Sequence, residues 1–274
     1  MVRRVPERLL VALARGHDPR HPLVRILPNN YQYPRGTMRT VTRHGVRLEI
    51  DLHDQIGWHA YFDLTVNDME RLRSVCRTGQ WVVDVGANIG ETSMLAAQGV
   101  GSTGKVFALE PHPGNYRRMI SNLALNSFTN ITPIQVALGD AEGSAMMDEP
   151  RHDNAGAHRV ATTGSIPVRV TTLDALALDR VDVLKVDTEG YETRVVRGGR
   201  STIARSRPVM FIEVHDGHLR DAGSSARELI RYVRELGYEV HDADTDQAVF
   251  PDSDFSNWTN VICLPSAGPA STLS

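Results

Sequence analysis

The chain has 274 residues, of which 41% are hydrophobic, and its formal net charge at pH 7 is −3. The small negative charge gives no electrostatic basis for nucleic acid as the main partner, and no apolar run reaches the roughly 18 residues that span a bilayer. With only two cysteines, Cys76 and Cys263, a framework of disulfides is excluded. We therefore predict a cytoplasmic protein with neither a nucleic acid nor a membrane as its partner. The sequence leaves the oligomeric state open.

The first quarter of the chain has a pattern of its own. Residues 9–14 form an apolar stretch that is too short for a secretory signal, and we expect a short amphipathic helix there. Residues 46–52 alternate between apolar and polar, which is typical of a half-buried strand, and a helical stretch begins at residue 68. We predict an N-terminal α/β appendage over residues 1–75, placed to cover a site on the main domain.

Strands and helices alternate regularly over residues 76–265, the predicted main domain. The expected strands span 81–85, 105–109, 131–138, 181–186, 208–214, 238–241 and 258–264. The expected helices span 91–98, 113–126, 191–204 and 226–236. Repeated right-handed strand–helix units of this kind build a doubly wound α/β fold with a mostly parallel, seven-stranded sheet. We expect residues 266–274 to form a flexible tail.

One long segment interrupts the alternation. Residues 148–165 are polar and typical of a loop, and an extra strand at 166–172 leads into a short helix at 173–176. A loop of this length inside a compact domain is usually functional or disordered. We predict that it is a mobile lid that becomes ordered when a ligand binds.

The most informative pattern is a glycine-rich turn at the end of the first main-domain strand. Asp84 lies near the end of that strand, and Gly86 and Gly90 follow it. Glycine is needed where the backbone passes close to a ligand or takes a positive φ. Glu110 ends the next strand, 24 residues after Gly86, where a carboxylate can accept hydrogen bonds from ribose hydroxyls. The pattern therefore predicts a nucleoside-type cofactor at the carboxyl ends of the strands.

The spacing of the loop indicates which cofactor this is. Asp84-x-Gly86-x-x-x-Gly90 does not match the G-x-G-x-x-G pattern that receives a pyrophosphate. The wider loop, opening with a carboxylate, better suits a sulfonium centre with an amino-acid tail, and it resembles the S-adenosylmethionine loop of class I methyltransferases. The alternative is that both glycines only permit close packing of a helix on a strand.

Each loop residue can then be given an expected role. Gly86 and Gly90 let the backbone pass beside the methionine part of the cofactor, and Asp84 acts on its ammonium group. Asn88 offers an amide. Thr92, at the start of the next helix, either binds the methionine carboxylate or serves the helix alone. The cofactor-binding set is completed by Glu110 at the ribose and by Ala137, which we expect to flank the adenine.

A second polar group follows the fourth and fifth strands. Asp187 and Glu189 come directly after the strand 181–186, and Glu213 and His215 share one face of the strand 208–214 because alternate residues point the same way. In one mechanism His215 or a carboxylate, Asp187 or Glu189, takes the proton of an acceptor hydroxyl. In the other, Asp187 and Glu213 bind Mg²⁺ or Mn²⁺, which lowers the pKa of the hydroxyl.

Structural explanations of the same residues stay open. Lys185 is on the same strand face as Asp187 and can simply pair with it. Glu189 can cap the helix that follows, since the helix dipole favours an anion there. Glu192, within that helix, fits best as a solvated or packing-related charge.

Seven motifs, in order along residues 81–215, resemble those of the FkbM family. They are Asp84-Val-Gly-Ala-Asn-Ile-Gly90, Glu110-Pro-His-Pro113, Asn122-Leu-Ala-Leu-Asn126, Val136-Ala-Leu-Gly-Asp140, Val170-Thr-Thr-Leu-Asp174, Leu184-Lys-Val-Asp-Thr-Glu-Gly190 and Pro208-Val-Met-Phe-Ile-Glu-Val-His215. The resemblance implies S-adenosylmethionine-dependent methyl transfer to a hydroxyl of a small molecule, such as a polyketide, a sugar or a glycolipid. It leaves the acceptor unnamed.

Two other functions compete with methyl transfer. A nucleotide-dependent oxidoreductase can use the same kind of sheet, but the missing third glycine of the dinucleotide pattern counts against it. A catalytically silent module that only binds the cofactor is the other alternative, and the polar group after the fourth and fifth strands counts against that.

Overall fold

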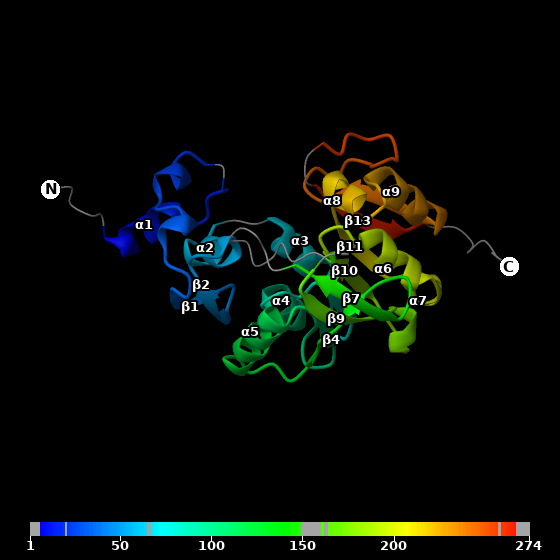
Figure 1. Cartoon of the computed structure of the whole chain (residues 1–274), viewed down its shortest axis with the longest axis horizontal. Coiled ribbons are helices and arrows are strands. Elements are labelled where there is room, and N and C mark those ends of the chain that lie inside the picture. Colours follow the sequence, from blue (N-terminus) through cyan, green and yellow to red (C-terminus); the bar gives the residue numbers. More distant parts are fainter. Residues whose placement is uncertain are drawn as a thin grey trace.

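The computed structural model describes residues 6–19, 21–64, 67–148, 160–161, 164–256 and 259–266. The chain forms two parts that lie side by side (Figure 1). Residues 6–64, here called the N-terminal unit, form the smaller part, and the residues from 67 onwards build the sheet and the helices that cover it. Within the described residues, no helix is both long and apolar enough to cross a membrane.

The central sheet confirms the predicted fold class. Its order is β12-β13-β11-β10-β3-β4-β5, and of these strands only β13 runs antiparallel to its neighbours. The strands are β3 (Trp81–Val85), β4 (Lys105–Leu109), β5 (Ile131–Ile134), β10 (Val183–Val186), β11 (Val209–Val214), β12 (Tyr238–Asp242) and β13 (Thr259–Pro265). The carboxyl ends of the other six strands meet at one edge, where open α/β sheets bind ligands.

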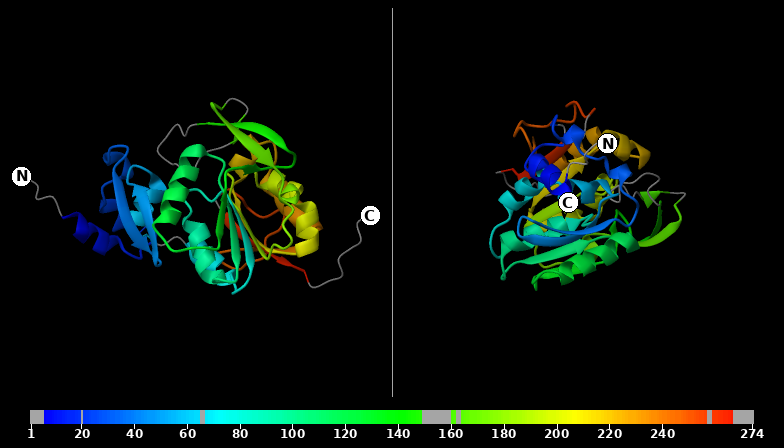
Figure 2. Two further views of the ribbon diagram at one scale, coloured as in Figure 1. Left: turned by 90° about the horizontal axis from the view of Figure 1, so that it is seen from below. Right: turned by 90° about the vertical axis from the view of Figure 1, so that its left-hand side faces the viewer.

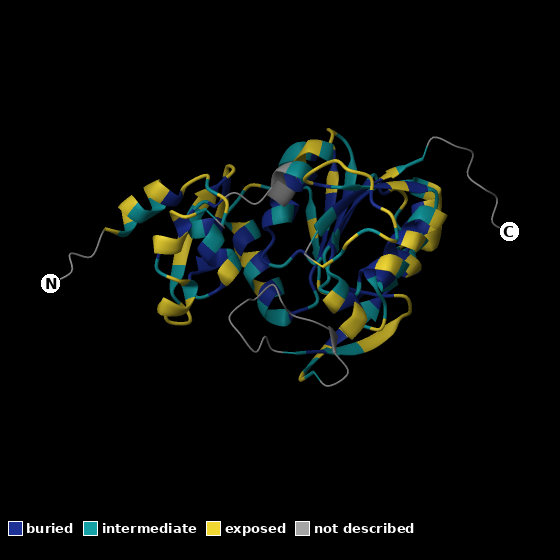
Figure 3. Cartoon of the chain, turned by 90° about the horizontal axis from the view of Figure 1, so that it is seen from above, coloured by how far each residue is buried: buried dark blue, intermediate teal, exposed yellow. Residues whose placement is uncertain are grey.

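Helices cover both faces of the sheet because alternate strand residues point to opposite faces. Val83 and Leu109 belong to the larger core, which also contains residues of α6 (Glu192–Gly198), α7 (Arg200–Ser206), α8 (Asp216–Asp221) and α9 (Ala226–Glu235). Val82 and Ala108 point to the other face, towards α3 (Asn67–Val75), α4 (Glu91–Val100) and α5 (Pro113–Ala124). The strands are accordingly buried between two helical layers (Figure 3).

The predicted strand 131–138 is wrong in one respect: it is two strands in two sheets. The backbone N–H of Val136 donates to the carbonyl of Ile134, and this tight turn ends β5. β6 (Ala137–Leu138) then joins a second sheet of order β6-β9-β7-β8 with β7 (Gly143–Met147), β8 (Val160–Ala161) and β9 (Ile166–Thr171). Pro133 is tolerated in β5 because β5 lies at the sheet edge, where a missing N–H matters least.

The predicted helix 191–204 is also wrong as a single element, because α6 ends and α7 begins around Gly199. A Cβ on Gly199 would lie 2.7 Å from Leu173 Cδ2, so a bulkier residue does not fit there. The predicted short helix at 173–176 is the 3₁₀ turn η3 (Asp174–Leu176). Most of the predicted lid, like residues 267–274 of the predicted tail, lies outside the described residues.

The N-terminal unit contains more regular structure than its sequence pattern indicates. It comprises α1 (Glu7–Ala14), the 3₁₀ turns η1 (Val24–Ile26) and η2 (Asn30–Gln32), the hairpin of β1 (Met38–Arg43) and β2 (Val46–Asp51), and α2 (Gln55–Tyr61). α1 and β2 were expected from the sequence, whereas β1 and α2 were not. The hairpin turns at His44 and Gly45, both with positive φ, as a two-residue hairpin loop requires.

Two asparagines, Asn122 in α5 and Asn126 just after it, attach this hairpin to the sheet domain. Asn126 bonds the backbone of Arg47 twice, accepting from its N–H at 2.9 Å and donating to its carbonyl at 2.8 Å. Asn122 accepts from Glu49 N–H at 2.7 Å and donates to the carbonyl of Ile89 at 3.0 Å. The side chain of Asn122 therefore links the N-terminal unit to the glycine loop between β3 and α4.

A buried ion pair makes the second attachment. Arg43 of β1 is 4% exposed and lies 3.2 Å from the carboxylate of Glu91, the first residue of α4, which is also 4% exposed. Arg43 additionally pairs with Asp63 at 3.5 Å and donates to the carbonyl of Leu64. Burial raises the pKa of Glu91, and the charge of Arg43 opposes that rise. Because Glu91 directly follows Gly90, the Arg43–Glu91 pair holds the end of the glycine loop against the N-terminal unit.

Replacing Arg43 by Met should destabilise the protein by about 3–5 kcal/mol at pH 7, because Glu91 is left as an uncompensated buried charge. The pKa of Glu91 is higher in the folded than in the unfolded protein. The cost in folding free energy of burying the ionised carboxylate therefore grows as the pH rises, and it is small below the unfolded-state pKa near 4.3. The loss should therefore shrink at acidic pH, as measured by urea unfolding. Arg47→Met, at an exposed arginine of the same hairpin, is the control, and Arg43→Met/Glu91→Leu should recover most of the loss.

Candidate active site

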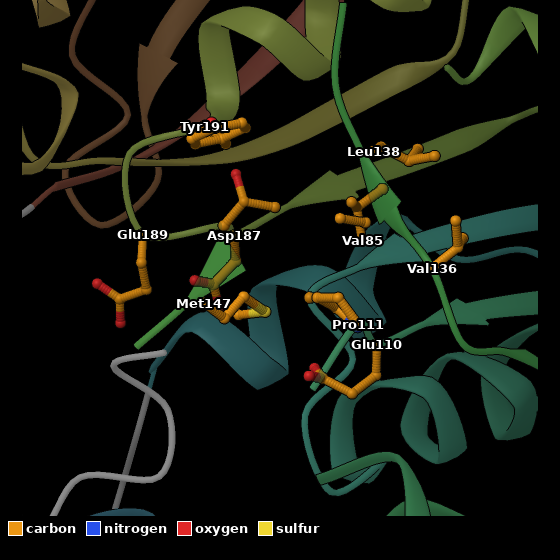
Figure 4. Close-up of a pocket in the computed structure, with 12 residues that line it drawn as sticks. Val85, Glu110, Pro111, Val136, Leu138, Met147, Asp187, Glu189 and Tyr191 are labelled. Atoms are coloured by element: carbon orange, nitrogen blue, oxygen red, sulfur yellow. The ribbon is translucent and has the colours of Figure 1, made fainter. Parts of the chain in front are cut away.

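A pocket opens at the carboxyl edge of the sheet and is lined by five of the eleven predicted site residues: Gly86, Glu110, Ala137, Asp187 and Glu189 (Figure 4). Glu110, Pro111 and the apolar side chains of Val85, Val136 and Leu138 lie on one side, and Asp187, Glu189 and Tyr191 lie on the other. The lining is completed by Gly86, Ala137, Met147 and Thr188. The predicted ribose residue and the predicted catalytic carboxylates Asp187 and Glu189 thus face one cavity.

The glycine loop has its shape because two backbone positions leave no room for a side chain. Gly86 has φ 82°, and a Cβ there would lie 1.8 Å from the carbonyl oxygen of Asp187. Gly90 has φ 90° and caps α4, and a Cβ there would lie 2.9 Å from Met119 Cγ. Close packing therefore explains why glycine is needed at both positions. Gly86 in addition lines the pocket.

The Asp84 carboxylate binds other side chains of the protein. It is fully buried, and its Oδ2 accepts hydrogen bonds from Thr92 Oγ1 at 2.7 Å and Ser93 Oγ at 2.6 Å. Its Oδ1 lies 3.2 Å from Lys185 Nζ. In this arrangement Asp84 and Thr92 fix the start of α4, and neither residue lines the pocket. Their predicted contacts with the methionine part of the cofactor remain predictions.

Lys185 connects the two halves of the site. Its ammonium group lies 3.2 Å from Asp84 and 3.2 Å from Asp187, and it donates to the carbonyl of Gly86 at 2.9 Å. Burial alone would lower the pKa of Lys185, but the two carboxylates raise it above its ordinary value. The predicted pairing of Lys185 with Asp187 is confirmed, and the same cation also holds the glycine loop.

Glu110 is a buried carboxyl group with two backbone partners. It accepts from Asn88 N–H at 2.9 Å and from His112 N–H at 2.8 Å. Burial raises the pKa of Glu110 to about 7, and the two N–H donors oppose the rise. A carboxyl group held at a strand end in this way is oriented to accept further hydrogen bonds from a diol.

Residues in the pocket and in the loop beside it suit the nucleoside part of S-adenosylmethionine on two counts. Asn88 has a left-handed backbone, φ 50°, and its Oδ1 is buried with no hydrogen-bond partner among the described residues. Ala137 and its neighbours Val136 and Leu138 form an apolar wall beside Glu110. An unsatisfied acceptor and a flat apolar wall next to a ribose-type carboxylate suit a purine nucleoside.

The opposite side of the pocket is acidic. The side chain of Asp187 is 39% exposed and points into the pocket, while Glu213 on the neighbouring strand is half-buried. Desolvation and the nearby carboxylates of Asp187, Glu189 and Glu192 raise the pKa of Glu213 well above its ordinary value. A hydrogen bond with the Asp187 side chain adds to this rise, which favours the neutral form of Glu213.

Glu192 organises the turn that carries these groups. Its Oε1 accepts from Thr188 N–H and Thr188 Oγ1, both at 2.9 Å, and from Gly190 N–H at 3.1 Å. It is 2% exposed, and burial raises its pKa. The turn also places Glu189 in a left-handed backbone conformation, φ 55°, which is uncommon for a residue other than glycine. The packing role expected for Glu192 is confirmed, and it is more specific than the sequence indicates.

Two histidines lie next to this turn. His218 Nδ1 is 2.8 Å from Glu189 Oε2, so the Glu189 carboxylate contacts a histidine ring, which differs from the helix-capping role considered for it. His215 caps α8, its Nδ1 accepts from His218 N–H at 3.1 Å, and the two rings are 3.8 Å apart. His215 does not line the pocket. Because Nδ1 is an acceptor here, the neutral ring carries its proton on Nε2, and the ring offers a donor instead of a base.

The described residues contain no group of three or more His, Cys, Asp or Glu side chains placed to hold a metal ion. Asp187 and Glu213 do lie together, and their binding of Mg²⁺ or Mn²⁺ stays a prediction. In this structure the charge of Asp187 is already paired with Lys185, whose Nζ lies 3.2 Å from Asp187 Oδ2.

Comparisons with known proteins identify the family. Residues 84–240 match the family model of the methyltransferase FkbM domain, which is more than half of the chain. The chain therefore belongs to the FkbM methyltransferase family, and its sheet has the class I methyltransferase fold. A comparison with curated proteins gives no match.

Three solved structures are similar in fold. FkbM from Methylobacillus flagellatus KT has 18% sequence identity and a TM-score of 0.48, over 76% of this chain and 52% of that one. This chain thus matches about half the length of that protein. M. jannaschii TYW2 in complex with AdoMet has 17% identity and a TM-score of 0.44, with coverages of 84% and 86%. Precorrin-6y C5,15-methyltransferase from Geobacter metallireducens GS-15 has 13% identity and a TM-score of 0.44, with coverages of 73% and 86%.

The pKa of Glu110 leads to a pH prediction. Because burial raises the pKa to about 7, the group is largely protonated in the free protein at pH 6. If the ribose binds the ionised form, S-adenosylmethionine affinity should rise with pH and level off above 7, with a limiting slope of about tenfold per pH unit. Calorimetry across this range measures the profile. Glu110→Gln should bind more weakly and lose this pH dependence, and a wild-type profile without an inflection would contradict the assignment.

Proposed function

We propose that this chain transfers a methyl group from S-adenosylmethionine to a hydroxyl group of a small molecule in the cytoplasm. Natural products of the polyketide, sugar or glycolipid type are the proposed acceptors. One observation carries the proposal: a single pocket brings Glu110, Gly86 and Ala137 together with Asp187 and Glu189. A nucleoside site therefore adjoins carboxylates that can act on an acceptor.

The cofactor site would use four groups. Glu110 would accept from the ribose hydroxyls, Ala137 and Val136 would contact the base, and Asn88 would use its unsatisfied Oδ1. When bound, S-adenosylmethionine supplies an electrophilic methyl group on a sulfonium. Gly86 lets the loop lie directly against Asp187, as the short distance from a Cβ to the Asp187 carbonyl shows.

Asp187 is the residue best placed to act on the acceptor. It lines the pocket, and Lys185 and Glu213 hold its carboxylate from behind. We assign it the role of orienting the acceptor hydroxyl and taking its proton as the oxygen attacks. Glu189 lines the same pocket, but its carboxylate is paired with His218, so we assign it a contact with the acceptor.

His215 supports the site in this proposal. A neutral imidazole whose Nδ1 caps a helix cannot take a proton at Nε2 without giving up its existing tautomer. The general-base role predicted for His215 therefore requires breaking its bond to His218 N–H. The metal-assisted alternative keeps Asp187 in the same place and differs in its response to chelators.

Cofactor binding is tested first, since it needs no acceptor. Calorimetry with S-adenosylmethionine, its demethylated product and NAD should show binding of the first two only. Glu110→Ala should weaken S-adenosylmethionine binding by about 1–3 kcal/mol, the range for a hydrogen bond to a charged group. Glu142→Ala, at an exposed carboxylate outside the pocket, is the control. Binding of NAD alone would favour an oxidoreductase.

The acceptor side is tested by release of the demethylated cofactor with a panel of hydroxylated polyketides and glycosides. With an accepted substrate, Asp187→Asn should lower turnover by about 10²–10⁴-fold while cofactor affinity stays near normal. His215→Asn, which keeps a capping side chain, should change turnover far less. Full activity of Asp187→Asn together with a large loss in His215→Asn would reverse the two assignments. Loss of activity on chelation, restored by Mg²⁺, would establish the metal-assisted mechanism.

A further inference from the structure

Large apolar side chains are exposed mainly at one place in the molecule. Among the described residues, three are exposed in the sheet domain, Ile120, Phe250 and Leu264. Five more fall within residues 9–31 of the N-terminal unit: Leu9, Leu13, Leu23, Ile26 and Tyr31. Ile26 is 63% exposed and Tyr31 is 59% exposed. Apolar exposure concentrated in this way marks an interaction surface.

These side chains belong to neighbouring elements at the outer end of the N-terminal unit. On α1, Leu10, Val11 and Ala14 pack inward, while Leu9 and Leu13, one turn apart, stay exposed. η1 carries Ile26, and a surface hollow lined by both Arg25 and Tyr31 joins η1 to η2. α1 and the turns after it form the end of the molecule that points away from the sheet domain (Figure 2). We call the five residues and these elements the outer end.

The part of the chain that carries the outer end is basic. Residues 1–64 contain ten arginines and six acidic residues, a net charge of +4, whereas the rest of the chain carries −7. Two acidic groups near the outer end are already paired, since Glu7 accepts from Tyr33 Oη and Asp63 binds Arg15 and Arg43. Arg8 and Arg25 are exposed beside the apolar side chains. The overall charge of −3 hides this asymmetry.

We propose that the outer end docks on an anionic lipid surface. Exposed leucine, isoleucine and tyrosine next to arginine suit the interfacial region of a bilayer, where apolar side chains enter the acyl boundary and arginines meet lipid phosphates. A nucleic acid would use the arginines but leave the apolar side chains in water. A second copy of the chain would bring two surfaces of the same positive charge together, which opposes association. The proposal replaces the sequence prediction of no membrane partner, which rested on the lack of an apolar run long enough to span a bilayer.

Sedimentation of the full chain with vesicles tests the proposal and requires no methyl acceptor. Binding to vesicles of phosphatidylcholine mixed with phosphatidylglycerol should be at least about tenfold stronger than binding to phosphatidylcholine alone, and high salt should remove the difference. Leu13→Glu and Ile26→Glu should abolish binding. Arg25→Gln should weaken it on anionic vesicles only. Phe250→Glu, at an exposed apolar residue of the sheet domain, is the matched control and should bind as the wild type does.

Four outcomes would overturn the proposal. The first is a wild-type protein that stays in the supernatant with both vesicle types. The second is a loss in Phe250→Glu equal to that in Leu13→Glu. The third is a change of oligomeric state in Leu13→Glu on gel filtration with unchanged vesicle binding, which would assign the outer end to a second copy. Single-stranded RNA binding that Arg25→Gln weakens and Leu13→Glu leaves intact, without vesicle binding, would assign it to nucleic acid. Calorimetry with S-adenosylmethionine checks that each variant is folded, so failure of the proposed function stays separate.

Discussion

The site depends on one buried ammonium group. Lys185 lies on β10, next to β3. Its ammonium group contacts Asp84 on β3, the Gly86 carbonyl in the glycine loop and Asp187 just after β10. A buried charge is tolerated only when paired and hydrogen bonded, and these partners satisfy it. The same contacts fix the distance between the cofactor loop and Asp187. Gly86 must be glycine for the same reason, because the loop lies directly on the Asp187 carbonyl.

This constraint divides the carboxylates of the site into two kinds. Asp84 and Glu192 are buried and hold backbone or hydroxyl groups in place, at the start of α4 and in the turn after β10. Glu110 and Asp187 face the pocket with acceptor capacity left for a ligand. Glu213 belongs to neither kind: desolvation and the carboxylates around it, Asp187 foremost, raise its pKa well above its ordinary value. The rise favours the neutral acid, which lessens the repulsion between two carboxyl groups at neighbouring strand ends.

Sequence reasoning could find the sheet, the loop and Glu110 because local rules determine them. Apolar runs followed by glycine or a carboxylate report directly on strand ends in a parallel sheet. The roles of Asp84 and Lys185 could not be found in this way, because they depend on pairing between β3 and β10, which are about a hundred residues apart in sequence. The split of 131–138 escaped detection because a turn at Gln135 leaves the apolar pattern intact. The tautomer of His215 follows from a helix cap that only the fold reveals.

The N-terminal unit is attached to the sheet domain beside the end of the glycine loop. Asn122 bonds both β2 and the carbonyl of Ile89, inside the glycine loop. Arg43 pairs with Glu91, the first residue after that loop. The N-terminal unit is therefore connected to the cofactor loop through two polar contacts, and Lys185 holds the same loop from the sheet by its bond to the Gly86 carbonyl. The loop that is proposed to hold the cofactor thus lies between two anchors, one in the sheet and one in the N-terminal unit, and its geometry requires both.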